Sequence, residues 1–367
     1  MFKGKIVFFR TDASLNIGTG HVMRCLTLAN ALASLGAKCQ FITRAHEGNI
    51  ASHIEATGFT CHLLPIANSA VSQGKEDYAR WLGCSQQQDA IETLAIINES
   101  KPDWLIVDHY ALDENWELLI KKAVTNLMVI DDLANRKHQC ELLLDQNLGR
   151  SDEDYQSLVP THCQRLYGPQ YALLRPEFSL QREASLAKRK NGKCESVLIT
   201  LGGVDKDNIT GQVLNALMHS NLPLSCHINV VMGASAPGIA QVKQAAEQLP
   251  WKTNVLVGVN DMANLMAESD LAIGAAGSTA WERCALGLPT IMIVIADNQY
   301  VIAKHLEEQK ACVVIWHPQQ ISVAIPSLLD ELISDKKTLP HMARICADIT
   351  DGAGVRRVIK AMSENNG

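Results

Sequence analysis

The sequence predicts an α/β protein with two domains, each built around a parallel β-sheet. Short apolar runs alternate with helix-periodic segments almost throughout the chain, which is typical of parallel strands joined by helices. The chain has 367 residues, which is long for one domain and sufficient for two. Hydrophobic residues make up 47% of it, so a core can form in each domain.

The first domain is predicted over residues 1–175. It begins with a strand at 5–10, a glycine-rich turn at 16–20 and a helix that ends at Gly36. Residues 67–90 are polar and carry no strong period before 89, so we expect an excursion from the sheet there. Further strands are predicted at 39–43, 59–64, 104–107, 127–130 and 141–144, with helices around 89–98 and 114–124.

The second domain is predicted over residues 195–350. Residues 176–194 are charged and helix-prone without an apolar stripe wide enough for a core, so we expect an interdomain linker there. Strands are predicted at 196–200, 228–232, 254–257, 271–275 and 290–295. The last segment, 351–367, contains a helix whose position allows it to cross back to the first domain.

Composition limits the classes of partner. The net charge is −6, the pI is about 6.1 and the basic residues are scattered, which argues against nucleic acid. No apolar run approaches the roughly 18 residues of a membrane span, so we expect no membrane partner. The eleven cysteines occur singly and without a CxxC pair, which favours buried reduced thiols over a metal site. We therefore expect a cytoplasmic protein without metal or cofactor.

Two groups of residues in the first domain follow predicted strands, at the sheet edge where ligands bind in open parallel sheets. In the first, Gly18 and Gly20 let the backbone approach a ligand, and His21 falls in the first turn of the next helix. The helix dipole favours a neutral imidazole that can accept a proton, although a solvent-facing residue is an equal alternative. The second group is Asp108-His109-Tyr110; the later pair Asp131-Asp132 either caps a loop or contacts a ligand.

Two further groups belong to the second domain. Gly202 and Gly203 open a turn that resembles a diphosphate-binding loop without the lysine of a Walker motif. Gly277, Ser278 and Thr279 lead from a strand of small residues into a helix, with Glu282 one turn further on. Asn298 and Gln299 follow the next strand. The alternative to a ligand site is an ordinary helix with a capped N-terminus. It would require the small residues of the turn, the carboxylate of Glu282 and the polar pair Asn298-Gln299 to occur together by chance.

This last pattern resembles the nucleotide-sugar signature of the glycosyltransferases with two Rossmann-type domains, especially the UDP-GlcNAc transferase of peptidoglycan synthesis. Five further segments narrow the resemblance to the UDP-sugar hydrolases of pseudaminic acid synthesis: FRTD (9–12), GTGHVMR (18–24), VDHY (107–110), IDDLANR (130–136) and YALLRP (171–176). Together the motifs extend from residue 9 to about 300, and none falls in 67–90. The resemblance implies a GT-B-like fold, with two Rossmann-type domains facing a central cleft.

The resemblance also implies a reaction. The family releases UDP from UDP-2,4-diacetamido-2,4,6-trideoxy-β-L-altropyranose by water attack at the anomeric carbon, with inversion and without metal. The free sugar then supplies surface glycans on flagellin or lipopolysaccharide. On this sequence the catalytic base would be His21, and we add the hypothesis that Asp12 orients His21 or the water.

The same resemblance implies a role for each binding residue. Glu282 would hold the ribose hydroxyls, Asn298 and Gln299 would face the sugar, and Tyr110 and Arg175 would contact the substrate. The backbone around Val259 would contact uracil. The turns at Gly18 and Gly20, Gly202 and Gly203, and Gly277 to Thr279 would line the rest of the site, with amides near Ser278 and at Gly202-Gly203 stabilising charge on the phosphates.

Two other classes of protein share this pattern. A glycosyltransferase would use the same fold and nucleotide site but deliver the sugar to an acceptor. Transferases with lipid acceptors often carry an apolar, basic patch on the first domain, and residues 1–66 show no such patch. A sugar-nucleotide binding module would keep Glu282 and the phosphate turns but would need no base, so removing His21 would have no effect on it.

Overall fold

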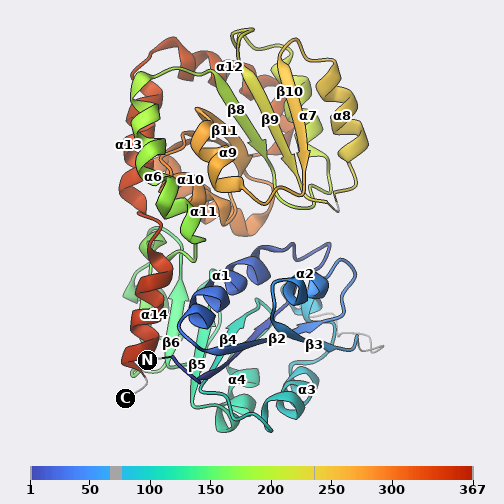
Figure 1. Ribbon diagram of the computed structural model, residues 1–367, viewed down its shortest axis with the longest axis vertical. Helices are drawn as coiled ribbons and strands as arrows, with labels where there is room; N and C mark the ends of the chain where they lie inside the picture. The colour runs from blue at the N-terminus through green and yellow to red at the C-terminus, as the bar shows by residue number, and fades with distance from the viewer. Residues whose placement is uncertain (1, 67–76, 235, 366–367) are drawn as a thin grey trace. The chain divides into compact units, whose positions relative to one another are not determined.

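The chain divides into two compact units. The computed structural model describes residues 2–66, 77–234 and 236–365 (Figure 1). Unit 1 comprises Met1–Leu173 and Gly354–Gly367, and unit 2 comprises Leu174–Ala353. Most of the predicted excursion, residues 67–76, lies outside the described residues. Its remainder begins with a 3₁₀ helix, η1 (Asp77–Leu82).

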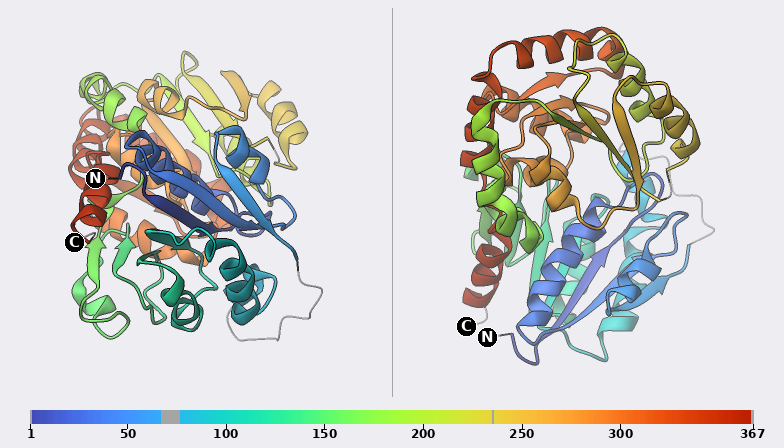
Figure 2. Two further views of the ribbon diagram at one scale, coloured as in Figure 1. Left: turned by 60° about the horizontal axis from the view of Figure 1, so that its bottom comes forward. Right: turned by 45° about the horizontal axis from the view of Figure 1, so that its top comes forward.

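Unit 1 contains a seven-stranded parallel sheet with the order β3-β2-β1-β4-β5-β6-β7. Figure 2 shows β1, β2 and β3 side by side in blue. The order reverses between β1 and β4, and ligands of doubly wound sheets bind beyond the carboxyl ends of the strands at such a point. The strands are β1 (Ile6–Thr11), β2 (Lys38–Arg44), β3 (Thr60–Leu64), β4 (Trp104–Asp108), β5 (Asn126–Ile130), β6 (Leu142–Asp145) and β7 (Gln164–Tyr167).

Helices cover both faces of this sheet (Figure 1). Because strand side chains alternate, Val7 and Phe9 pack in one cluster while Phe8 packs in another on the opposite face. The first cluster includes buried residues of α1 (Gly20–Ser34), α2 (Ala51–Ala56) and α14 (Gly354–Glu364). The second includes residues of α3 (Gln86–Ile97), α4 (Glu114–Ile120) and α5 (Asp152–Tyr155).

Unit 2 contains a six-stranded parallel sheet with the order β10-β9-β8-β11-β12-β13, which reverses between β8 and β11. The strands are β8 (Ser196–Thr200), β9 (His227–Met232), β10 (Lys252–Val257), β11 (Leu271–Ala275), β12 (Thr290–Ile293) and β13 (Cys312–Ile315). One core cluster joins the sheet to α7 (Ile209–Leu217), α8 (Ile239–Glu247) and α12 (Ile321–Ser334). The remaining helices are α6 (Pro176–Lys188), α9 (Met262–Glu268), α10 (Thr279–Ala285), α11 (Tyr300–Glu308) and α13 (Thr338–Ile349). The two parallel sheets confirm the predicted fold class.

The segment that we predicted to be a linker, 176–194, instead belongs to unit 2, and most of it forms helix α6. Helix α6 contacts α9, α10 and α13. Polar side chains make much of this packing, because Arg182 of α6 and Arg189 of the following 3₁₀ helix η4 (Arg189–Asn191) donate hydrogen bonds to main-chain carbonyls at the C-terminal ends of those three helices. The acceptors are the carbonyl oxygens of Ala285, Ala347 and Thr350 for Arg182, and of Met266 and Ala267 for Arg189. Cations are stabilised at such ends, so this helix packs without a wide apolar stripe.

Two expectations from composition concern the whole chain. Within the part of the chain that the structure describes, no helix has both the length and the apolar character that a membrane crossing requires. All eleven cysteines are free thiols, and only Cys61 and Cys194 are partly exposed.

Replacing Arg182 with Ala should lower the free energy of unfolding by about 2–3 kcal/mol, because it leaves three partly buried carbonyls without their charged donor. Arg344→Ala is the matched control, since Arg344 is 65% exposed and pairs with the exposed Asp348. That substitution should change the free energy by at most about 0.5 kcal/mol. Urea denaturation followed by circular dichroism measures both, and equal effects would contradict the packing role of α6.

Candidate active site

The strand-order reversal in unit 1 brings His21 beside Asp108. Thr11 at the end of β1 pairs with Asp108 at the end of β4, and α1 follows β1 through a short turn. Gly18 adopts a φ of +77° in this turn, which a residue with a side chain rarely tolerates. His21, in the first turn of α1, therefore projects to the same edge, with Nδ1 2.6 Å from Asp108 Oδ1.

Arg24 lies one helical turn after His21 and holds the same carboxylate. Its Nε and Nη2 donate to the two oxygens of Asp108 at 2.6 and 2.7 Å, a two-point contact that fixes the carboxylate plane. Asp108 is fully buried, and burial alone would raise its pKa. The charges of Arg24 and His21 outweigh that effect, so the pKa of Asp108 lies well below its ordinary range.

This contact determines which nitrogen of His21 is the free acceptor. An ionised Asp108 can only accept a hydrogen bond, so Nδ1 of His21 must carry the hydrogen. Nε2 then keeps its lone pair, which is the arrangement of the histidine–aspartate part of a catalytic triad. The side chain of His21 is 10% exposed, so a small molecule or water can reach it.

Tyr110 also lies beside His21. Its ring meets the imidazole edge to face, with centroids 4.6 Å apart. Its hydroxyl donates to Asp132 Oδ2 at 2.9 Å, and Arg24 donates to the same atom at 2.7 Å. Burial, with the nearby Asp132 charge, raises the pKa of Tyr110 well above its ordinary value, so the phenol stays protonated.

The two residues of the pair Asp131-Asp132, for which we considered loop capping and ligand contact, lie in different surroundings. Asp131 accepts hydrogen bonds from the Ala134 amide and from Arg136, so it caps the loop after β5. Asp132 joins Arg24 and Tyr110 and therefore belongs to the network around His21.

The structure corrects the first alternative of our hypothesis, that Asp12 orients His21, because Asp108 makes that contact; the second, that Asp12 orients the water, stays a prediction. Asp12 is fully buried, and Arg10 donates to both of its oxygens, at 2.6 and 3.0 Å. Burial raises the pKa of Asp12, but Arg10 more than reverses this and holds it well below the ordinary range. Its other hydrogen-bond and charge partners are Thr43, the Arg44 amide, His46 and His109. Asp12 therefore cross-links β1, β2 and β4.

In unit 2, the two glycine turns follow the neighbouring strands β8 and β11 at the reversal point. Gly202 has a φ of +102°, and a side chain at Gly202 or Gly277 would meet no atom within 4 Å. Both turns are therefore open to a ligand. The first-turn amides of α7 are not, because Asp205 accepts from Ile209 and Thr210, and Asn208 accepts from Gly211. The Gly202-Gly203 turn, and not the start of α7, is the accessible part of the predicted diphosphate loop.

Glu282 and Arg175 lie close enough in unit 2 for their charges to interact. Burial raises the pKa of Glu282 to about 7, and the positive charge of Arg175 opposes this. Arg175 also donates to the carbonyl of Asn260, the residue after Val259, and its guanidinium lies over the Phe178 ring. The structure thus brings Arg175, Glu282 and the Val259 loop together.

The other predicted residues of unit 2 differ in accessibility. Ser278 is exposed and its side chain caps no amide, whereas Thr279 Oγ1 accepts a hydrogen bond from Arg283. Asn298 is exposed, but the side-chain oxygen of Gln299 accepts from the Ile295 amide and so holds its own loop. Ser278 and Asn298 therefore remain the freer candidates for ligand contact.

The sequence assigned no role to Arg24, and it placed Asp108 and Asp132 near the site without identifying their partners, although all three lie inside the motifs. Their signal was a charged residue in an otherwise apolar run, such as Arg24 between Met23 and Cys25. A buried charge requires a partner, but a single sequence does not identify it.

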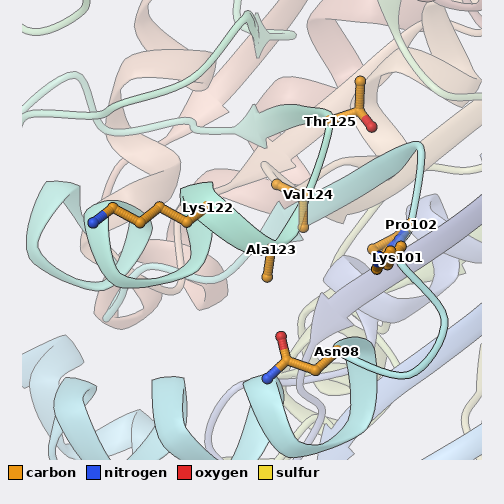
Figure 3. Close-up of a pocket in the computed structure, with 7 residues that line it drawn as sticks. All are labelled: Asn98, Lys101, Pro102, Lys122, Ala123, Val124 and Thr125. Carbon is orange, nitrogen blue, oxygen red and sulfur yellow. The ribbon is translucent and has the colours of Figure 1, made fainter.

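A hollow lies on the surface of unit 1, away from the candidate active site. A shallow pocket of about 370 Å³ lies at the opposite edge of the unit 1 sheet, where β4 and β5 begin (Figure 3). Asn98 and Ala123 point toward one another across it, and it contains none of the predicted site residues. Among the described residues, no group of three or more His, Cys, Asp or Glu side chains could hold a metal ion.

Comparisons with known proteins agree with the fold and the motifs. Residues 197–354 match the family described as Glycosyltransferase family 28 C-terminal domain. The solved structure of Acinetobacter baumannii MurG aligns over 98% of this chain and 99% of its own, with a TM-score of 0.68 and 15% identity. The chain therefore has the GT-B fold, with two Rossmann-like units.

Two curated relatives resemble the chain along most of its length. It is 27% identical over 303 residues to the UDP-2,4-diacetamido-2,4,6-trideoxy-beta-L-altropyranose hydrolase of Campylobacter jejuni, covering 83% of this chain and 96% of the relative. It is 26% identical over 294 residues to an uncharacterized Methanocaldococcus jannaschii protein, covering 77% of this chain and 54% of the longer relative. These alignments confirm the resemblance inferred from the motifs.

Replacing Asp12 with Asn should lower the free energy of unfolding by about 3 kcal/mol or more, because it leaves the buried Arg10 partly unpaired. Asp152→Asn is the control, since Asp152 is 70% exposed in its pair with Arg165 and should contribute less than about 1 kcal/mol. Chemical denaturation measures both variants. An Asp12→Asn variant that is as stable as the control would show that the cross-link is unimportant.

Proposed function

We propose that the chain hydrolyses a UDP-activated sugar, and that its substrate is UDP-2,4-diacetamido-2,4,6-trideoxy-β-L-altropyranose. The observation that carries the proposal is the His21–Asp108 contact, which leaves Nε2 of His21 as a free proton acceptor at the edge of unit 1. The similarity to the Campylobacter hydrolase supports the choice of substrate. The product would be a precursor of pseudaminic acid for surface glycans.

In the proposed reaction, Nε2 of His21 accepts a proton from water while the water oxygen bonds to the anomeric carbon. The bond between that carbon and the UDP oxygen breaks, and its electron pair leaves with UDP. Asp108 stabilises the imidazolium that forms, and Arg24 keeps Asp108 in place. General-base assistance of this kind contributes about 10²–10⁴ in rate. Attack on the face opposite to UDP inverts the anomeric configuration.

Unit 2 would bind the nucleotide in this proposal. Glu282 would accept hydrogen bonds from the two ribose hydroxyls, and the backbone near Val259 would contact uracil. The open turns at Gly202-Gly203 and Gly277-Ser278 would hold the diphosphate through main-chain amides. Because UDP leaves as a stabilised anion, the reaction needs no metal and little acid assistance.

A glycosyltransferase is the second candidate, because the family 28 domain match and the MurG-like fold favour it. It would use the same residues on the UDP side. The difference lies in the group that accepts the sugar, since a transferase requires an acceptor hydroxyl where a hydrolase admits water.

The wild-type protein should release UDP from the altrose-configured substrate in buffer with EDTA and without acceptor. His21→Ala should bind UDP normally but release it about 10²–10⁴-fold more slowly, because the base is lost. Asp108→Asn should show a similar kcat defect, since an amide no longer enforces the hydrogen on Nδ1. UDP release is measured with a coupled nucleoside-diphosphate assay.

His53→Ala is the control for these variants, because His53 is an exposed residue of α2 and plays no part in the proposed site. It should turn over like the wild type. UDP release that begins only when an acceptor is added would identify a transferase. Unchanged turnover in His21→Ala would remove the catalytic role of this histidine.

The affinity for UDP should weaken as the pH falls below about 7. Glu282 has a pKa raised to about 7, and the proposed ribose contact needs its ionised form. Below that pH the carboxyl group must first lose its proton, which weakens the binding of UDP. Isothermal titration calorimetry between pH 6 and 9 measures this for the wild type and Glu282→Gln. The Gln variant should bind about tenfold or more weakly at pH 8, for loss of a charged hydrogen bond.

The ratio of the two dissociation constants isolates Glu282, because the terminal phosphate of UDP also titrates near pH 6 and affects both proteins alike. That ratio should approach a constant above pH 8 and shrink toward pH 6. Glu308→Gln, at an exposed residue of α11, should follow the wild type. A ratio that does not vary with pH would contradict the ribose role of Glu282.

A further inference from the structure

Two aromatic residues contact Tyr110, the neighbour of the proposed base, and belong to none of the motifs. Helix η1 places Tyr78 and Trp81 against Tyr110 in unit 1. The Trp81 ring stacks on Tyr110 with centroids 5.7 Å apart and planes at 23°, and Tyr78 meets Tyr110 edge to face at 5.2 Å. Tyr110 in turn contacts His21. A single aromatic ring therefore separates the imidazole from Trp81.

The segment that follows these aromatic residues is anchored in the core. Leu82 is 1% exposed and Cys84 is 3% exposed, and both pack in the cluster that contains Phe8. Gly83, between them, has a φ of +72°, and a side chain there would lie 2.9 Å from the His46 ring. This close approach holds the end of η1 against the sheet, so Trp81 has a defined place relative to His21.

Trp81 and Tyr78 are only partly buried, whereas Tyr110 between them and His21 is 7% exposed. A partly uncovered indole and phenol next to a catalytic base are suited to contact an apolar part of the substrate. The guanidinium of Arg136 lies 6.0 Å from the Tyr110 ring centre. The wall formed by Tyr78, Trp81 and Tyr110, here termed the aromatic wall, offers the ring carbon of three aromatic side chains.

We infer that the aromatic wall is a subsite for the methyl-bearing substituents of the hexose, and that Tyr78 and Trp81 determine specificity for a deoxy, acetamido sugar over a fully hydroxylated one. The inference rests on the proposed function, because it takes His21 to mark the position of the anomeric carbon. A 6-deoxy methyl group and two acetamido methyl groups gain from leaving water against aromatic carbon. A C6 hydroxyl at the same place would lose hydrogen bonds to water without replacement.

Removing Trp81 should therefore affect one class of sugar selectively. Burial of two or three methyl groups against an aromatic ring corresponds to a gain of about 10–100-fold in kcat/KM. In Trp81→Ala, kcat/KM for the 2,4-diacetamido-2,4,6-trideoxy substrate should fall by about that factor, mostly through KM. The same constant for UDP-glucose, low in the wild type, should change less than about threefold, and the affinity for UDP alone should stay constant, because neither molecule has a methyl group to place on the wall.

Two further variants test whether the effect comes from the indole surface. Trp81→Phe retains an aromatic face and should recover activity to within a few fold of the wild type. Ile91→Ala removes an exposed apolar side chain of α3, which is 55% exposed, and should behave like the wild type. Melting temperatures of all variants are compared, since a general loss of structure would reduce activity on both sugars together.

Direct binding separates this inference from the proposed function. The His21→Ala protein is titrated with UDP, UDP-glucose and the altrose-configured UDP-sugar, with and without Trp81→Ala, so that affinity is read without turnover. A preference for the deoxy, acetamido sugar that disappears with Trp81 supports the aromatic wall even if the wild type proves to be a transferase. Equal losses for both sugars, or an unchanged preference, would overturn the inference even if hydrolysis is confirmed.

Discussion

A buried carboxylate with two partners organises the site of unit 1. Asp108 lies at the end of β4 without exposure to water, and an isolated charge there would be very costly. Arg24 and His21, both on α1, share its two oxygens. The helix that follows β1 is therefore tied to the neighbouring strand β4 at the point where the strand order reverses. The same contacts fix the position and the tautomer of the histidine, so stability and chemistry depend on one interaction.

The two units use the same sheet topology with different chemistry. At the reversal point of unit 1, ionic side chains meet, and a second buried network around Asp12 supports them by joining β1, β2 and β4. At the reversal point of unit 2, glycines and small residues leave open turns, and Glu282 with Arg175 supplies the charge. This contrast agrees with the proposal that unit 1 supplies the catalytic base and unit 2 binds the nucleotide. A proton acceptor needs rigid polar partners, whereas a diphosphate needs accessible main-chain amides.

The sequence predicted the parallel sheets well, because buried parallel strands read as apolar runs followed by turns. It did not predict two four-residue edge strands: β7, whose residues Gln164 and Arg165 are polar, and β13 (Cys312–Ile315), which is apolar but short. It also mistook 176–194 for a linker, since that segment packs through Arg182 and Arg189 rather than through an apolar stripe. Patterns of hydrophobicity cannot show cations that bind helix ends distant in sequence.

The candidate site shows the same limit. His21 and Tyr110 were identified from their motifs, and the structure places them together. The partner of His21 was assigned to Asp12, nine residues away, whereas Asp108 is 87 residues away. Nearness in sequence misled here, because parallel strands bring together residues separated by whole helices. Trp81 had no motif and was found only through its ring contacts.

The central claim is that water, positioned by His21, attacks the anomeric carbon of a UDP-sugar. The most direct measurement is turnover in water enriched in oxygen-18, with mass spectrometry of both products and NMR of the first sugar anomer formed. The account predicts one labelled oxygen in the free sugar, none in UDP, and inversion at the anomeric carbon. Label in the UDP phosphate would place the attack on phosphorus, and retention of configuration would require a covalent intermediate; either result would contradict the account.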